Sequence, residues 1–286
     1  MTQAAEIASL LARAAAALER LAPPPPPIPA WDAPAYVWEA ATGTVRPAPH
    51  AQALPLALLR GVEAQKQTLL ANTRRFAQGL PANDALLWGA RGMGKSALVK
   101  AVHREAASAG RPDLKLIEIH AGDLSRLDAL LDLVSAAPIR AIVFCDDLAF
   151  SQSDSAYRAA KALLEGGVGG RPSNAIFYAT SNRRHLMPRE MGENERSTAI
   201  HPDEEAEERM SLSDRFGLWL GFHACTQDVY LDIVSGYAEA FPLPIAPEDL
   251  RTRALAWSVG RSARSGRTAW QFIRDLAGEF GVKIGA

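Results

Sequence analysis

The clearest chemical signal in the sequence is one stretch with the spacing G-x-x-x-x-G-K-S, made of Gly89, Ala90, Arg91, Gly92, Met93, Gly94, Lys95 and Ser96. Glycines at these places let backbone N–H groups turn toward an anion, and a following helix points its positive end there. Lys95 is expected to neutralise the β- and γ-phosphates of a nucleotide, and the Ser96 hydroxyl to hold Mg²⁺. The eight residues and Ala97 are therefore predicted to bind the phosphates.

The residues on either side provide the context that a phosphate-binding loop needs. Residues 85–88 are apolar and strand-like, and residues 97–102 have the composition of a helix. A strand before the loop and a helix after it favour phosphate binding over the alternative, a glycine-rich turn that happens to precede a helix.

Two adjacent carboxylates follow the most apolar stretch of the chain. Residues 141–145 are all apolar and predict a central parallel strand that is buried on both faces, and Asp146 and Asp147 come directly after it. Ligands of parallel sheets bind beyond the carboxyl ends of the strands, where the phosphate loop also emerges. We expect Asp146 to bind Mg²⁺ and Asp147 to orient or deprotonate the attacking water. The alternative is an Asp that caps the following helix.

The next predicted strand, residues 175–180, delivers Asn182 to the same edge of the sheet. A side-chain amide there can hydrogen-bond both the γ-phosphate and the attacking water. Its alternative role is that of a turn-forming Asn, which is common in loops.

Composition limits the class of protein. The 286 residues include 31 Lys and Arg against 32 Asp and Glu, which argues against a generally basic, nucleic-acid-binding coat. The two cysteines, Cys145 and Cys225, form no disulfide framework and favour a reducing compartment. No apolar stretch has the length of a membrane span, and charged residues interrupt the N-terminal one. We expect a soluble, cytoplasmic protein without membrane contact.

Four regions follow from the pattern of the sequence. Residues 1–22 predict an amphipathic helix, and residues 23–57 a Pro-rich linker and an irregular or short-stranded segment packed on the domain. Residues 58–225 are expected to form the nucleotide-binding domain, and residues 226–286 a helical lid domain.

Periodicity and turn residues predict the remaining elements. Strands are expected at residues 116–119 and 218–222, and helices at 58–76, 124–134, 156–164, 226–241, 248–259 and 268–280. The glycine-rich stretch 166–170 predicts a connector, and the charged stretch 189–209 a solvated helix or loop. Leu59 and Gly61 are candidates for contact with the base, with core packing as the alternative.

Five motifs occur in the order found in AAA+ ATPases, at residues 89–96, 144–147, 180–182, 214–217 and 265–267. The chain resembles this superfamily over about residues 58–282. It more closely resembles a bacterial group of single-module AAA+ proteins that is described as a domain of unknown function. The resemblance implies an α/β fold, with a five-stranded parallel sheet flanked by helices and a small all-helical C-terminal lid.

The resemblance also assigns roles to single residues. It makes Lys95 and Ser96 the Walker A residues, Asp146 and Asp147 the Walker B pair, and Asn182 sensor 1. Arg267 becomes sensor 2, and Arg215 becomes an arginine finger that acts on the nucleotide of a neighbouring subunit. The superfamily usually has Glu at the place of Asp147, which puts the water-activating role of this residue in question. Residues 120–124 lack the aromatic-Gly pair of polypeptide-threading rings.

The function predicted from these residues is hydrolysis of ATP to ADP with Mg²⁺, coupled to the remodelling or loading of a protein or DNA by a homo-oligomer. A second hypothesis is a nucleotide-gated DNA-binding or loader module with slow hydrolysis, which would use the basic stretch 251–267. A third is a small-molecule kinase with the same phosphate loop. A GTPase is disfavoured because the sequence has no Asn-Lys-x-Asp segment.

Overall fold

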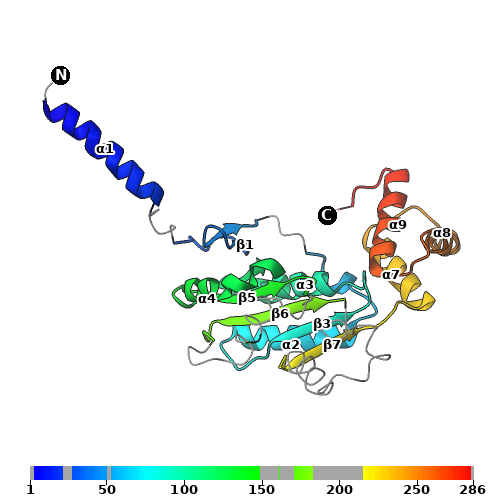
Figure 1. The fold of residues 1–286 in the computed structure, drawn as a ribbon. Helices are drawn as coiled ribbons and strands as arrows, with labels where there is room; N and C mark the ends of the chain where they lie inside the picture. Colours follow the sequence, from blue (N-terminus) through cyan, green and yellow to red (C-terminus); the bar gives the residue numbers. More distant parts are fainter. Residues whose placement is uncertain are drawn as a thin grey trace, which may run out of the picture.

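The structure is a computed structural model, and it describes residues 3–21, 28–49, 53–148, 161, 171–182 and 215–284. The described residues form a layered α/β body and a group of three helices beside it (Figure 1). The expected connector at 166–170, the charged stretch 189–209 and Asp214 lie outside the described residues, as does nearly all of the expected helix at 156–164.

The body is built on one sheet, in which the described residues form seven strands in the order β2-β1-β4-β5-β6-β3-β7. The strands are β1 (Ala35–Glu39), β2 (Thr44–Pro47), β3 (Ala85–Gly89), β4 (Leu114–Ile119), β5 (Arg140–Cys145), β6 (Ala175–Ser181) and β7 (Leu218–Phe222). All neighbours pair in parallel except β1 and β2, which are antiparallel. The expected parallel α/β sheet is confirmed.

The expected number of five strands is wrong, because residues 35–47 add two strands to the edge beside β4. The side chains of Tyr36 and Trp38 are 2% and 1% exposed, and Tyr36 stands in register with Ile117 of β4. Strands β1 and β2 have five and four residues, and the sequence had left open whether this segment is irregular or short-stranded. Pairing with β4 provides the order that the local sequence does not.

Helices cover both faces of the sheet. Helices α2 (Glu63–Ala77) and α3 (Lys95–Ser108) pack on one face, and η2 (Ala121–Arg126) and α4 (Leu127–Ser135) contribute to the core of the other. Strand β5 lies between these two cores, and its residues from Ala141 to Cys145 are at most 1% exposed. The strand ends that carry the site are thus fixed by a close-packed interior.

Helix α2 begins five residues later than the sequence predicted. Residues Leu56–Leu58 form a short 3₁₀ turn, η1, and Gly61 has a φ of 77°, which breaks the helical path before Glu63. Residues 54–62, which include η1, therefore form a strap that runs beside the phosphate loop instead of the first turns of a helix.

Helices α7 (Gln227–Ala240), α8 (Pro247–Gly260) and α9 (Gly266–Glu279) form the group beside the sheet, and all three predicted helices are confirmed. They enclose a core of their own, which includes Tyr230, Ile233 and Phe272. Ser265 begins α9 by accepting a hydrogen bond from the Thr268 amide at 3.1 Å.

The predicted N-terminal helix is confirmed as α1 (Gln3–Leu21), which Figure 1 shows extending away from the sheet. Its apolar residues Ile7, Leu10 and Leu11 are exposed. No helix among the described residues is both long enough and apolar enough to cross a membrane.

Candidate nucleotide-binding site

A cavity of about 570 Å³ opens where the strand ends of the sheet meet the three C-terminal helices. Its walls come from the phosphate loop, the ends of β5 and β6, the strap 54–62, and helices α7 and α9. The predicted site residues that line it are Arg91, Gly92, Met93, Gly94, Lys95, Ser96, Ala97, Asp146, Asp147, Asn182 and Arg267. Residues from six separate parts of the chain therefore line this cavity, and the predicted site residues come from four of them.

The phosphate loop adopts a backbone that requires glycine. Gly89 has a φ of 119°, and a Cβ there would lie 2.1 Å from the Phe222 carbonyl oxygen of β7. Gly94 has a φ of 90° and is the N-cap of α3, so the first turn of α3 begins directly at the cavity. The N–H groups of that turn lack helical partners and form an anion-binding helix end.

Lys95 is 7% exposed, and three oxygens accept hydrogen bonds from its ammonium group. Two are the carbonyls of Gly89 and Ala90 at 2.8 and 2.9 Å, and the third is Oδ1 of Asn182 at 3.0 Å. Burial lowers the pKa of Lys95, and the charges of Asp147 and Asp146 partly oppose this. The lysine is thus a buried cation at the loop, held by neutral acceptors that a phosphate can replace.

Ser96 and Asp146 bring two oxygen ligands together at the first turn of α3. The Ser96 hydroxyl donates to Oδ1 of Asp146 at 2.6 Å. Mg²⁺ prefers oxygen ligands and is usually held by one or two carboxylates together with substrate phosphates and waters. A hydroxyl and a carboxylate at the mouth of a phosphate loop fit this ion.

Asp147 and Asn182 are joined by a hydrogen bond of 2.5 Å from the amide nitrogen of Asn182 to the carboxylate. The same amide accepts from Lys95 through its oxygen. A continuous polar connection therefore runs from the lysine through Asn182 to Asp147, and all three side chains line the cavity.

Arg267 enters the cavity from the first turn of α9. Its backbone N–H donates to the Gly92 carbonyl at 3.0 Å, which joins the helix group to the phosphate loop. Gly92 has a φ of 75°, and a Cβ there would lie 2.8 Å from the Ser265 hydroxyl. Only glycine permits this close approach of α9 to the loop.

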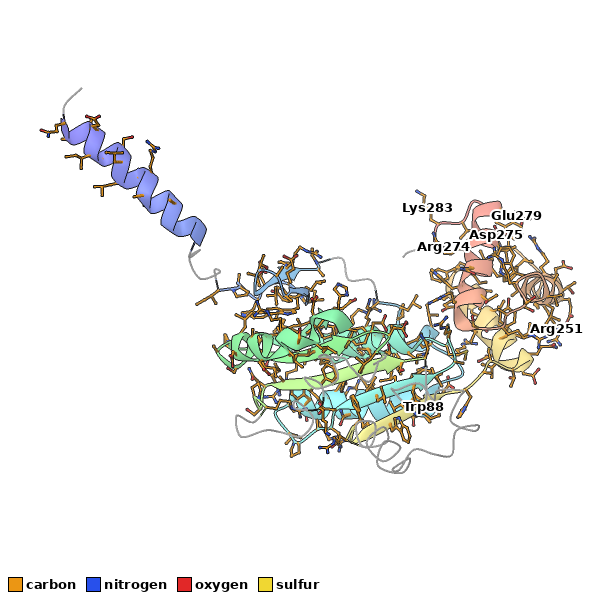
Figure 2. All side chains as sticks on the ribbon, viewed as in Figure 1. Trp88, Arg251, Arg274, Asp275, Glu279 and Lys283 are labelled. Carbon is orange, nitrogen blue, oxygen red and sulfur yellow. The ribbon has the colours of Figure 1, made fainter. Side chains whose placement is uncertain are left out.

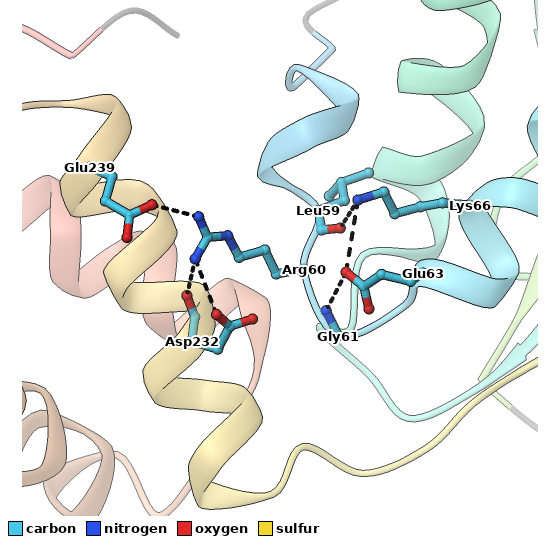
Figure 3. A network of polar contacts seen from close by, with 7 residues as sticks. All are labelled: Leu59, Arg60, Gly61, Glu63, Lys66, Asp232 and Glu239. Atoms are coloured by element: carbon cyan, nitrogen blue, oxygen red, sulfur yellow. Dashed lines mark hydrogen bonds and ion pairs between the residues drawn. The ribbon is translucent and has the colours of Figure 1, made fainter.

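Arg60, on the strap, holds the strap against α7 (Figure 3). Its guanidinium donates to the Asp232 carboxylate at 3.1 Å and to Glu239 at 2.6 Å. It lies across Gly236 so closely that a Cβ there would be 2.4 Å from its Nε atom. The strap and α7 thereby form one apolar wall of the cavity, which includes Leu59, Ile233, Tyr237 and, from α9, Trp270.

Arg215 is not among the residues that line this cavity. It precedes the first residue of β7, whereas the phosphate loop follows the last residue of β3, and the two strands are parallel. A five-residue strand spans roughly 16 Å. The cavity is therefore at the opposite end of β7 from Arg215.

The sequence analysis did not predict Thr180, Arg60, Tyr237 or Trp270 as site residues, although all four line the cavity. Thr180 occurs in one of the motifs, but its side-chain role depends on the neighbouring strand. Arg60 carried one usable signal, because Gly61 beside it marks a break before α2. The aromatic residues have helical spacing that is equally typical of core packing.

Residues 31–280 match the model of one protein family, described as "Protein of unknown function (DUF815)". The chain belongs to this family. The matched DUF815 region covers the sheet, including β1 and β2, and the three C-terminal helices. No curated protein matches the sequence of the chain.

Solved structures of AAA+ P-loop ATPases share the fold of this DUF815 protein. Orc1 of Aeropyrum pernix, solved with DNA, superposes with a TM-score of 0.55 at 16% identity, over 79% of this chain and 64% of that one. A variant of RuvB of Thermotoga maritima gives a TM-score of 0.50 at 18% identity, over 78% and 65%. The chain thus spans just under two thirds of these structures, and the likeness establishes the AAA+ fold.

Proposed function

We propose that this protein is an ATPase that hydrolyses Mg²⁺-bound ATP and couples the cycle to movement of helices α7 to α9 against the sheet. One observation supports this most directly: Lys95, Ser96, Asp146, Asp147, Asn182 and Arg267 line the same cavity. A phosphate loop alone would support binding, whereas a carboxylate and an amide beyond the loop also support attack by water.

Each residue has a distinct task in this mechanism. The Lys95 ammonium and the loop N–H groups neutralise and orient the phosphates. Ser96 and Asp146 would hold Mg²⁺, which when bound offsets charge on the phosphate oxygens. Asp147 accepts a proton from the attacking water, and Asn182 positions that water relative to the phosphate.

Turnover of ATP by the purified full chain tests this proposal. The wild type should release inorganic phosphate from ATP without an added acceptor, which also separates a hydrolase from a small-molecule kinase. Lys95→Ala should abolish turnover, because it removes the buried cation of the loop. Phosphate release that is absent in the wild type, or undiminished in Lys95→Ala, contradicts the proposal.

The proposal includes a homo-oligomer in which Arg215 contacts the nucleotide of a neighbouring subunit. The position of Arg215 at the far end of β7 from its own phosphate loop supports a role in trans. Such an arginine contributes about 10³ to 10⁵ in rate. Mixing tests it: Arg215→Ala and Lys95→Ala should each be inactive, and the mixture should recover activity at mixed interfaces. A mixture that remains inactive contradicts action in trans.

The transmitting element in this proposal is the helix group, which contacts the phosphate loop through Arg267 and the strap through Arg60. Residues 226–286 would then act as a lid on a nucleotide-binding domain of residues 58–225. Bound ATP would pull Arg267 and α9 inward, and loss of the γ-phosphate would release them. We place the protein in the cytoplasm, and the two free thiols, Cys145 and Cys225, support a reducing compartment.

The partner moved by the lid is proposed to be a protein or DNA. One observation favours DNA: Arg91 and Arg264 line a second groove, of about 520 Å³, beside the phosphate loop. The surface of α9 is not broadly basic, because Asp275 and Glu279 lie beside Arg274 on its outer part (Figure 2). The loader role predicts that DNA stimulates ATP turnover. It also predicts that DNA binding weakens as the salt concentration rises and is lost on charge reversal at Arg261 and Arg264.

A further inference from the structure

Strand β5 leaves the sheet at a defined place, immediately after Cys145. Cys145 is still in register with Ala179 of β6, so the next pair of a regular ladder would be Asp146 and Thr180. The chain instead turns away at Asp147, which has a φ of 53°. Non-glycine residues seldom adopt this left-handed conformation, although Asp and Asn tolerate it best, and strain of this kind persists only where surrounding contacts enforce it.

Thr180 makes three hydrogen bonds to the residues at which β5 turns away, Asp146, Asp147 and Leu148. Its carbonyl accepts from the Leu148 amide at 2.6 Å, and its hydroxyl accepts from the Asp147 amide at 2.9 Å. The hydroxyl hydrogen is directed to Oδ1 of Asp146 at 2.5 Å. One side chain thus binds the backbone of Asp147 and the carboxylate of Asp146 simultaneously.

Because Thr180 is buried, no solvent molecule can easily take the place of its hydroxyl in these hydrogen bonds. The residue is 1% exposed. Oδ1 of Asp146 also accepts from Ser96 and from the Asp147 amide, at 2.6 and 3.2 Å. With these donors on Oδ1, the carboxylate has a fixed orientation that leaves its other oxygen for a ligand.

We propose that Thr180 is the positioning residue of this site, whose hydroxyl sets both carboxylates by holding Asp146 for Mg²⁺ and locking Asp147 in the left-handed turn that presents it to Asn182. This inference rests on the proposed ATPase function and adds a residue to it. Thr180 acts through the two aspartates and does not itself contact the reacting atoms. The turn also explains why this position has Asp and not Glu, because a longer acid tolerates the left-handed conformation less well.

Thr180→Val tests the hydroxyl while it preserves the shape of the side chain. Loss of a group that orients a metal ligand typically costs about 10- to 100-fold in metal affinity or activity. We expect kcat to fall by that factor, the Mg²⁺ concentration for half-maximal rate to rise, and KM for ATP to change by less than about 3-fold, since the phosphate loop is untouched. Thr180→Ser retains the hydroxyl and should restore most of the rate.

Thr73→Val provides a matched control. Thr73 is also a buried threonine, and its hydroxyl hydrogen-bonds the Leu69 carbonyl and the Tyr178 hydroxyl, both at 2.8 Å, outside the cavity. It should lower thermal stability without changing kcat or the Mg²⁺ requirement. A wild-type kcat in Thr180→Val, or equal losses of kcat in the two variants, overturns the inference.

A readout without turnover keeps this inference separate from the proposed function. In a crystal structure of Thr180→Val, φ at Asp147 should leave the left-handed region and the Asp146 carboxylate should rotate. Retention of both conformations overturns the positioning role even if ATP is hydrolysed. If the wild type fails to hydrolyse ATP, the proposed function is wrong, and the conformation at Asp147 still decides whether Thr180 holds the turn.

Discussion

The two walls of the cavity are built differently. On the sheet wall, Asp146, Asp147 and Asn182 follow buried strands and are fixed by hydrogen bonds of 2.5 to 3.2 Å to the loop and to one another. On the lid wall, Ile233, Tyr237 and Trp270 offer mainly apolar surface from helices that have their own core. Arg60 and the backbone of Arg267 make polar contacts between the helix group and the body.

This contrast assigns a different part of the reaction to each wall. Rigid, hydrogen-bonded groups are suited to stabilise a transition state, because they need no reorganisation as charge develops. In the proposed function, the apolar surface of the separately packed helix group contributes to nucleotide affinity and moves without disturbing the carboxylates. Changes in the sheet wall should therefore alter kcat, and changes in the lid wall should alter affinity. Substitutions in each wall test this division.

Among the substitutions that compare the two walls, Asp147→Asn should have the largest effect, because it keeps a residue type that tolerates positive φ and removes only the base. Loss of a general base typically lowers the rate by about 10² to 10⁴. We expect this loss in kcat, with a nucleotide dissociation constant within about 3-fold of wild type, measured by steady-state kinetics and equilibrium binding. An intact kcat would remove Asp147 from the chemistry and break the division at its strongest point.

Gly92→Ala should break the contact between the two walls. The added Cβ would lie 2.8 Å from the Ser265 hydroxyl at a φ of 75°, so α9 must withdraw from the loop. We expect nucleotide affinity to fall by about 10-fold or more because α9 no longer contacts the loop. A 10-fold loss corresponds to about 1.4 kcal/mol of binding free energy. Gly43→Ala is the control, because Gly43 has a φ of 67° but nothing within 4 Å of an added Cβ. It should lower stability alone; equal affinities in the two variants would contradict the role of the contact.

Arg60→Met should weaken the lid wall more mildly. The side chains of its partners Asp232 and Glu239 are 55% and 68% exposed, and each exposed ion pair contributes roughly 0.2 to 1 kcal/mol. We expect nucleotide affinity to fall by about 3- to 10-fold with kcat nearly unchanged, and the fluorescence of Trp270 to respond less to ATP. Arg253→Met, which breaks a pair with Glu279 inside the lid, should leave affinity unaltered. A larger effect on kcat than on affinity would assign Arg60 to the chemistry.

The smallest effect concerns the protonation of Lys95. Burial lowers its pKa in the folded protein below the usual 10.5, so between the two values the unfolded chain binds more protons. The free energy of unfolding should then rise with pH in that interval, by at most about 1.4 kcal/mol per pH unit. Denaturant titrations at several pH values give the change of the free energy of unfolding with pH for wild type and Lys95→Met. The contribution of Lys95 to this slope should be absent in the variant. Equal slopes would show that the cation is not destabilised before nucleotide binds.

Local sequence patterns predicted the phosphate loop, the five strands β3 to β7, the helices α7 to α9 and the candidate residues at the sheet edge. These features are local: a glycine spacing, an apolar run that ends in two acids, and periods typical of helices. Parallel pairing then requires that the strand ends meet, so Asp146 and Asn182 could be placed together before any coordinates were known.

The tertiary structure alone decided the features that depend on distant partners. The addition of β1 and β2 to the sheet depends on pairing with β4, and the contacts of Arg60 depend on Asp232 and Glu239, more than 170 residues away. Thr180 belongs to the site because β5 turns aside next to it and needs its hydroxyl. The periodicity of a sequence indicates which face of a helix or strand is buried. The roles of these residues depend instead on which atoms of distant elements come into contact, and those contacts form only when the chain packs.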